Sequence, residues 1–233
     1  MKINGLQKLT LLDYPGHVAC TVFLSGCNWR CPFCHNASLA VGSAGDVMEE
    51  DEFFAFLSGR RRILDGVAIT GGEPLLRPDI AGFAAKIKEL GFKVKLDTNG
   101  TRPDRLREMI DSGVVDYVAM DIKNSPGKYP VTTGSAVNDA AGDLALVKES
   151  AAILMSGVVE YEFRTTVVHE LHEKDDFIKI GEWLRGAEKY FLQQFRDSGE
   201  IISPGLTSPT AEEMAAFADA VRPYIPSVFL RGV

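Results

Sequence analysis

The feature that most constrains the fold of this chain is a regular alternation of short β-branched segments with longer amphipathic segments. Apolar residues between the short segments recur at helical spacing and stop at glycines, as in the stripe from Ile80 to Leu90 that ends at Gly91. This alternation indicates βαβ units and a parallel sheet. The candidate strands are residues 18–24, 67–70, 93–98, 115–122, 158–168 and 189–195.

About six such units are too few for the usual eight-fold barrel, so periodicity alone allows an incomplete barrel or an open sheet. In both folds ligands bind at the carboxyl ends of the strands. Three motifs fall there: a cysteine loop after the first strand, 70–74 (TGGEP) after the second and 97–100 (DTNG) after the third. Asp121 ends the fourth strand. We therefore expect one site at this rim, in a single domain spanning residues 1–233.

The four cysteines of the chain lie close together in the sequence, at Cys20, Cys27, Cys31 and Cys34. The last three place three thiolates within eight residues, a donor set that suits zinc or an iron–sulfur cluster. A closed zinc site requires a fourth ligand, for which Cys20 and His35 are the candidates. Cys20 lies in an apolar strand pattern, and we interpret it as a small buried side chain. A [4Fe–4S] cluster on three cysteines leaves one iron free to bind a small molecule.

The cysteine loop resembles a known signature. Residues 27–34 (CNWRCPFC), with Phe33 before the last cysteine, are similar to the signature of the radical S-adenosylmethionine (SAM) superfamily. Residues 13–16 (DYPG) and 34–36 (CHN) resemble the activating enzymes of glycyl radical enzymes, in particular the activating proteins of anaerobic ribonucleoside-triphosphate reductase. The resemblance extends over nearly the whole chain, and it implies an incomplete (βα)6 TIM-like barrel of the radical SAM type.

The resemblance also implies a mechanism. SAM would bind the open iron through its amino and carboxylate groups, and an electron from the reduced cluster would break the C5′–S bond. The resulting 5′-deoxyadenosyl radical would abstract hydrogen from a glycine of a partner, most simply an anaerobic ribonucleotide reductase. The implied cofactors are a [4Fe–4S] cluster, SAM and, as in some relatives, a monovalent cation. The implied electron donor is a flavodoxin or a ferredoxin.

Individual site residues follow from the same resemblance. Phe33 would pack its backbone against the adenine, and Gly71, Gly72 and Glu73 would receive the SAM amino group, with Glu73 accepting from the ammonium. The residues that resemble positions around the SAM carboxylate, the ribose and the cation are Asp97, Thr98, Asn99 and Asp121. The three cluster ligands would be Cys27, Cys31 and Cys34.

Lys123 and Arg164 are candidate partners of the SAM carboxylate because they lie near the same rim. Arg164 falls inside a strand pattern, where a long charged side chain otherwise needs an internal acidic partner. A structural ion pair is therefore an equal alternative for Arg164. For Lys123 the alternative is a solvated strand end.

Two competing functions remain open at this stage. One is a radical SAM enzyme for a small molecule, such as 7-carboxy-7-deazaguanine synthase, and the other is a zinc module without catalytic activity. A zinc module has no reason to contain TGGEP and DTNG, and the DYPG and CHN motifs favour the activating enzyme. The net charge of −7 argues against a nucleic-acid binder. Because the chain shows neither a long apolar run nor a secretory signal, we expect no membrane partner and a cytoplasmic location.

Overall fold

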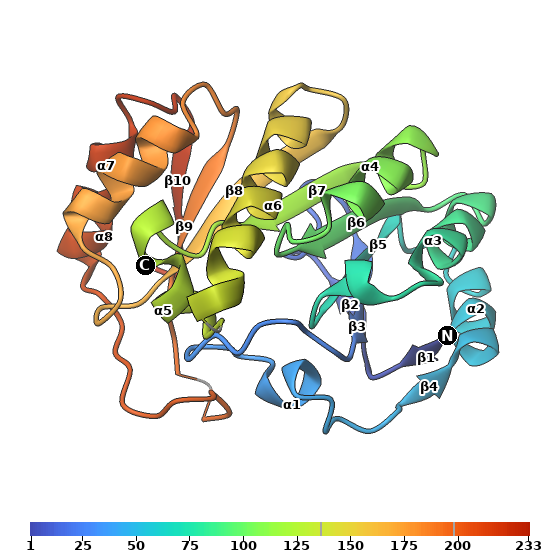
Figure 1. The fold of residues 1–233 in the computed structure, drawn as a ribbon. Coiled ribbons are helices and arrows are strands. Elements are labelled where there is room, and N and C mark those ends of the chain that lie inside the picture. The colour runs from blue at the N-terminus through green and yellow to red at the C-terminus, as the bar shows by residue number, and fades with distance from the viewer. Residues whose placement is uncertain (136, 198) are drawn as a thin grey trace.

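An eight-stranded curved sheet organises the molecule, which the computed structural model describes at residues 1–135, 137–197 and 199–233, except for the side chains of 137–141. Seven of its strands run parallel, and the edge strand β2 pairs antiparallel with β3 (Figure 1). In sheet order the strands are β10 (Val228–Arg231), β9 (Tyr190–Gln194), β8 (Glu160–Val167), β7 (Tyr117–Asp121), β6 (Lys93–Thr98), β5 (Gly66–Gly71), β3 (Ala19–Leu24) and β2 (Gly5–Thr10).

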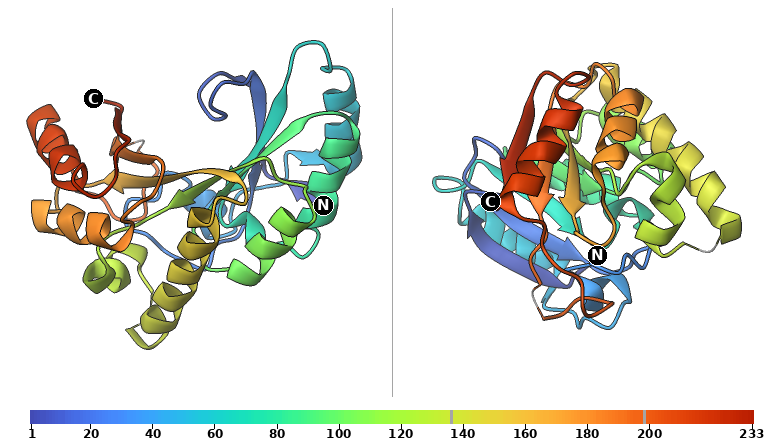
Figure 2. Two further views of the ribbon diagram at one scale, coloured as in Figure 1. Left: turned by 90° about the horizontal axis from the view of Figure 1, so that it is seen from above. Right: turned by 90° about the vertical axis from the view of Figure 1, so that its left-hand side faces the viewer.

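Helices connect the parallel strands and lie along the outer face of the curved sheet (Figure 2, left). The crossover helices are α2 (Glu50–Ser58), α3 (Ile80–Glu89), α4 (Pro103–Asp111), α6 (Val137–Met155), α7 (Lys174–Trp183) and α8 (Ala211–Val221). The shorter elements are β1 (Lys2–Ile3), α1 (Ala37–Ala40), β4 (Met48–Glu49), the 3-10 turns η1 (Pro74–Leu76) and η2 (Pro126–Lys128), and α5 (Tyr129–Thr133). This arrangement is the predicted incomplete TIM-like barrel.

All six predicted strands are present, as β3 and β5 to β9. The eight-stranded sheet contains two further strands, β2 and β10, and β1 pairs with β4 outside it; the sequence pattern predicted none of these four. β10 has only four residues, too few for a periodicity to emerge, and β2 has an exposed middle without apolar alternation. These two strands form the opposite edges of the sheet.

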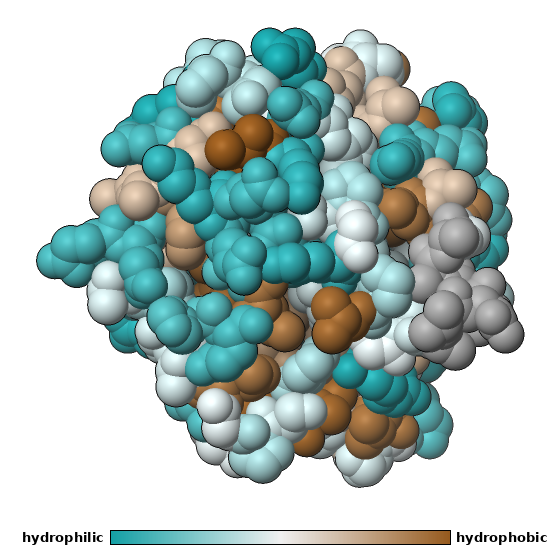
Figure 3. All heavy atoms as spheres, turned by 60° about the vertical axis from the view of Figure 1, so that its left-hand side comes forward, coloured by the Kyte–Doolittle hydropathy of each residue, from teal (hydrophilic) through white to brown (hydrophobic). Residues whose placement is uncertain are grey.

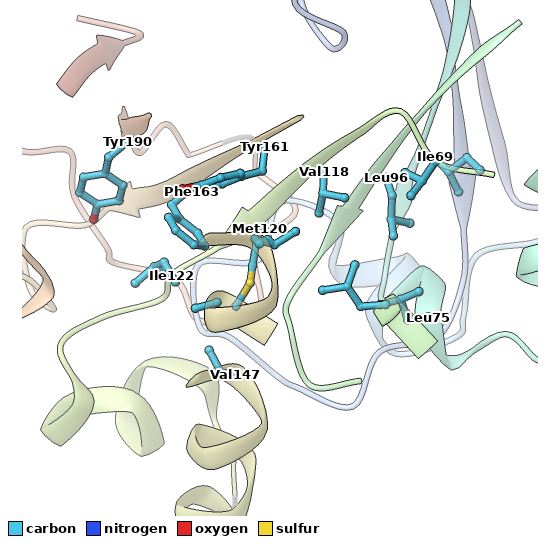
Figure 4. Close-up of a cluster of buried hydrophobic side chains, with 14 of the residues drawn as sticks. Ile69, Leu75, Leu96, Val118, Met120, Ile122, Val147, Tyr161, Phe163 and Tyr190 are labelled. Carbon is cyan, nitrogen blue, oxygen red and sulfur yellow. The ribbon is translucent and has the colours of Figure 1, made fainter. Parts of the chain in front are cut away.

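Alternation along each parallel strand separates an apolar face from a charged face. Leu96, Val118 and Phe163 are fully buried on the helix side, together with the other side chains of Figure 4. Because successive strand residues point to opposite faces, Lys95, Asp97, Asp121, Glu162 and Arg164 project to the concave side, where they line a cavity. The helices thus cover the apolar face and leave the polar face for the site.

The surface shown in Figure 3 has the mainly hydrophilic character that is usual for a folded protein. Its hydrophobic residues form separate small groups. Over the ranges that the structure describes, no helix is both long enough and apolar enough to cross a membrane.

The last strand is held by an ion pair that reaches into the concave side. The Arg231 guanidinium on β10 donates to both carboxylate oxygens of Glu162 on β8, at 2.8 and 2.9 Å. Glu162 is 1% exposed and also accepts from the hydroxyl of Tyr117 at 2.9 Å. The guanidinium stacks on the Phe191 ring of β9, 3.6 Å from its centre. Arg231 therefore ties β10 to β8 across β9.

Arg231→Met should lower the free energy of unfolding, because Glu162 would keep, among the described residues, only the Tyr117 hydroxyl as a hydrogen-bond partner. A hydrogen bond to a buried charged group is worth about 1.5–3 kcal/mol. Urea unfolding measures the change. The matched control is Arg222→Met, which removes an exposed ion pair with Asp219 and should cost less than about 1 kcal/mol. Equal losses in the two variants would show that the Arg231 pair has no structural role beyond a surface contact.

Candidate functional site

The predicted site residues meet at one cavity of about 770 Å³ at the carboxyl ends of the strands. Its wall includes the three clustered cysteines and nine of the ten other predicted residues, namely Phe33, Gly71, Gly72, Asp97, Thr98, Asn99, Asp121, Lys123 and Arg164. Glu73, the tenth, is 2% exposed and lies behind this wall. The cavity also touches Pro15 of the DYPG turn and Gly232 beside β10, so it reaches both edges of the sheet.

Hydrogen bonds hold the cysteine loop in place. The thiol of Cys27 accepts from the amide of Trp29 at 3.4 Å, and the amide of Cys34 donates to the carbonyl of Cys31 at 3.0 Å. The Arg30 amide donates to Thr133 at the end of α5, at 2.9 Å. Trp29 is 2% exposed, and its indole N–H donates to the carboxylate of Asp143 at 2.8 Å.

The three loop thiols are free, and Cys31 is buried while Cys27 and Cys34 are half-buried. Burial raises the pKa of Cys27, and it raises the pKa of Cys31 to about 12 although the nearby Lys123 ammonium opposes this shift. Metal binding would have to displace these protons. Among the described residues, no three His, Cys, Asp or Glu side chains converge closely enough for a single metal ion. Three thiols spread over one wall instead fit a larger iron–sulfur centre.

The two candidates for a fourth ligand differ in position. Cys20 is fully buried within β3, which confirms its interpretation as a small core residue. His35 lines the cavity, and its ring lies 5.4 Å from that of Phe195. Of the four thiols, those of Cys27, Cys31 and Cys34 line the cavity, and that of Cys20 does not.

Gly71 and Gly72 are required by the packing of the protein itself. Gly71 has φ of +120°, and a Cβ atom there would lie 2.3 Å from the carbonyl oxygen of Leu24. A Cβ atom at Gly72 would lie 2.1 Å from the carbonyl oxygen of Gly26. The amides of Gly72 and Glu73 donate to these same oxygens, at 2.7 and 2.8 Å. The glycines thus let this turn lie directly against the start of the cysteine loop.

The carboxylate of Glu73 is already occupied by donors of the chain. One oxygen accepts from the Leu75 amide at 3.0 Å and the Thr98 hydroxyl at 2.9 Å, and the other accepts from the Asn99 amide at 2.6 Å. Burial raises the pKa of Glu73 to about 7, while the three donors oppose the shift. These three donors leave acceptor capacity on the carboxylate, so its contact with a ligand ammonium stays a prediction. In the structure Glu73 joins the 71–75 turn to the DTNG loop.

The DTNG loop in turn contacts the cysteine loop. The side-chain amide of Asn99 donates to Asn28 at 2.9 Å and lies 3.9 Å from the sulfur of Cys27. Its oxygen accepts from the amide of Thr101 at 3.0 Å. The Thr98 hydroxyl is used by Glu73 and by the Gly100 amide. These two predicted residues therefore fix the loops on the cavity wall.

A network of five ionic side chains forms the cavity floor. Arg164 donates to Asp121 at 2.5 Å and to Asp97 at 3.0 Å, Lys123 lies 2.7 Å from Asp121, and Lys95 pairs with Asp97. Burial would raise the pKa of both carboxyl groups, but the adjacent cations hold it below the ordinary value. A structural ion pair is thus confirmed for Arg164. A solvated strand end is wrong for Lys123, whose side chain is only 15% exposed.

Sequence reasoning missed four charged residues of this wall, Lys95, Glu162, Arg196 and Arg231. Lys95 lies two positions before Asp97 and Glu162 two before Arg164, so the period of a strand could have placed both on the same face. Arg231 gave no such signal because its strand was not predicted.

Comparisons with known proteins agree on one family. The sequence profile of the Radical SAM superfamily matches residues 21–149. A protein of Methanocaldococcus jannaschii, provisionally described as a glycyl-radical enzyme activating enzyme, is 30% identical over 99% of this chain and 96% of its own length. The pyruvate formate-lyase-activating enzyme of Clostridium pasteurianum is 30% identical over 53% of this chain and 52% of its length. The crystal structure of a radical SAM methyltransferase from Sphaerobacter thermophilus has a TM-score of 0.68 and 17% identity, covering 96% of this chain and 68% of that one.

Glu73→Gln should destabilise the protein even without any ligand, because the new amide nitrogen cannot accept the bond that a carboxylate oxygen accepts. One buried donor left unsatisfied costs about 1–3 kcal/mol, measurable by urea unfolding. The control is Glu149→Gln on the exposed side of α6, which should leave the unfolding curve unchanged. If Glu73→Gln unfolds like the wild type but fails to bind SAM, the carboxylate acts on the ligand and not on the fold.

Proposed function

Because this chain belongs to the radical SAM superfamily, and within it to the activating enzymes of glycyl radical enzymes, we propose that it cleaves SAM in the cavity described above and generates a radical on a glycine of a partner enzyme. The observation that carries the proposal is the placement of three free thiols, Cys27, Cys31 and Cys34, on one wall of that cavity. The similarity to the activating enzymes extends beyond the cysteine loop to nearly the whole chain.

The family implies a [4Fe–4S] cluster and SAM as cofactors. The donor set fits: Cys27, Cys31 and Cys34 would hold three irons and leave the fourth for SAM. When bound, the reduced cluster supplies the electron that cleaves SAM to methionine and a 5′-deoxyadenosyl radical. Trp29 would exclude water from this chemistry, since it is buried at the cavity wall.

The backbone at Gly71 and Gly72 is the proposed contact for the SAM amino group. These residues line the cavity without side chains, so carbonyl oxygens are the acceptors that they can offer. Glu73 would act behind them as a positioning residue, because its carboxylate is bonded to the DTNG loop. Phe33 lies on the cavity wall, where its backbone is the proposed contact for the adenine.

Lys123 and Arg164 are the proposed partners of the SAM carboxylate. Both are cationic side chains on the cavity wall. Asp97 and Asp121 would hold these two cations in position, with the ribose hydroxyls as their further proposed contacts. Thr98 and Asn99 would support the same end of the ligand through the loop that they stabilise.

The proposed hydrogen donor is a backbone glycine of an anaerobic ribonucleotide reductase. A glycine Cα is a suitable target because no side chain blocks its approach to the cavity. The proposed electron donor is a flavodoxin or a ferredoxin, and the proposed setting is the cytoplasm. We also propose that residues 1–233 form a single domain.

The first test concerns the cluster. Anaerobically reconstituted wild-type protein should be brown and contain about four irons, the content of one [4Fe–4S] cluster. Cys31→Ala should lose the cluster because two thiolates cannot replace three. Cys20→Ala is the matched control and should keep it, since Cys20 is buried in β3. A full cluster in Cys31→Ala would contradict the proposed ligand set.

The second test concerns the reaction. Reduced protein, SAM and an anaerobic ribonucleotide reductase should yield 5′-deoxyadenosine by chromatography and a glycine-centred doublet by electron paramagnetic resonance. Dioxygen should then cleave the reductase at one glycine. Turnover of a free pterin with no radical on any candidate protein would favour the alternative, a small-molecule enzyme such as 7-carboxy-7-deazaguanine synthase. An intact, reduced cluster that forms no 5′-deoxyadenosine at all would contradict both.

A further inference from the structure

Lys95 occupies an unusual position for a lysine, because its side chain lies on the concave face of the sheet and is only 2% exposed. Its neighbours Val94 and Leu96 are fully buried in the apolar core. Strand alternation therefore directs Lys95 and Asp97 together to the cavity side. A buried ammonium is strongly unfavourable unless it is paired, and Asp97 provides the partner.

A second cation reaches Asp97 from two strands away. Asp97 on β6 pairs in register with Ala119 on β7, and Asp121 of β7 pairs with Arg164 on β8. Ala119 carries only a methyl group on the face that it shares with Asp121. The Arg164 side chain can therefore pass over β7 and donate to Asp97 at 3.0 Å while its Nε donates to Asp121 at 2.5 Å.

As a result, each of the four carboxylate oxygens pairs with a cation, and Arg164 serves two of them. In Asp97, Oδ1 pairs with Lys95 and Oδ2 with Arg164. In Asp121, Oδ1 pairs with Arg164 and Oδ2 with Lys123. Three cationic side chains against two carboxylates give the network a net charge of +1. One added carboxylate would bring that charge to zero.

We propose that Lys95 is a positioning residue that takes the place of a dissociable monovalent cation in this site. This inference rests on the proposed function. Its ammonium holds Asp97 in place and supplies the one positive charge that balances the SAM carboxylate. Without Lys95, the two carboxylates and the SAM carboxylate would face only Lys123 and Arg164, and one negative charge would remain. The protein should therefore bind SAM without sodium or potassium, contrary to the cation that the sequence resemblance implied.

The test uses Lys95→Met, which keeps an unbranched side chain and removes the charge. This variant leaves one oxygen of Asp97 without its cation, in a site of balanced charge before SAM arrives. The matched control is Lys93→Met, on the same strand but exposed to solvent. All proteins are reconstituted anaerobically, checked for iron content, and titrated with SAM by equilibrium dialysis in choline, sodium or potassium chloride at one ionic strength.

We expect the same SAM affinity in all three salts for the wild type and for Lys93→Met. Lys95→Met should bind SAM about 10- to 100-fold more weakly in choline, the loss typical of one charge-assisted contact. Sodium or potassium should restore a large part of that affinity. A purely structural role of Lys95 would not produce this cation-specific rescue.

Three results would overturn the proposal: a wild type that needs sodium or potassium, a Lys95→Met variant with unchanged affinity in choline, or a loss that neither cation restores. If Lys95→Met does not fold, the wild type still decides the question. Specific broadening of the ²³Na resonance by wild-type protein, displaced by potassium, would reveal the cation site that the proposal denies. This measurement needs neither cluster nor SAM. Failure of reconstituted wild type to bind SAM in any salt would instead count against the proposed function.

Discussion

The arrangement of the site depends on the close approach of two backbone segments, the turn at Gly71 and Gly72 and the start of the cysteine loop at Gly26. The Glu73 amide donates to the Gly26 carbonyl, and the Glu73 carboxylate accepts from the Asn99 amide. The Asn99 side chain then returns to the cysteine loop at Asn28. These contacts form a closed circuit, so a shift in any one segment displaces the others. Two positions without a Cβ make the circuit sterically possible.

The charged floor of the cavity depends on a second constraint, the strict alternation of a parallel strand. Helices cover one face of the sheet, so that face must be apolar, and the polar residues of each strand are directed to the cavity. Charges that collect there are expensive unless they are paired with good geometry. The network from Lys95 to Lys123 and the separate pair of Glu162 with Arg231 meet that requirement. A rigid, charged floor is thus a consequence of the fold itself.

The sequence was sufficient to predict the features that depend on local patterns of residues. Periodicity located six strands, and their carboxyl ends brought the cysteine loop, TGGEP, DTNG and Asp121 to one rim. The sequence was insufficient to predict contacts that depend on strand register or on backbone packing. The orientation of Glu73 is decided by donors 25 and 26 residues away, and the reach of Arg164 to Asp97 depends on a small residue in the strand between them. β10 was missed because four residues carry no usable period.

Lys123 links the charged cavity floor to the cysteine loop, because its ammonium interacts with both the Asp121 carboxylate and the Cys31 thiol. Burial alone would lower the pKa of Lys123, but Asp121 and the neighbouring Cys31 raise it above its ordinary value. The same positive charge opposes the effect of burial on Cys31 and so favours its thiolate. Thiolates are the form that binds iron. A charge placed to receive a ligand carboxylate therefore also assists the deprotonation that precedes cluster binding, which gives a physical reason for placing Lys123 between Asp121 and the cysteine loop.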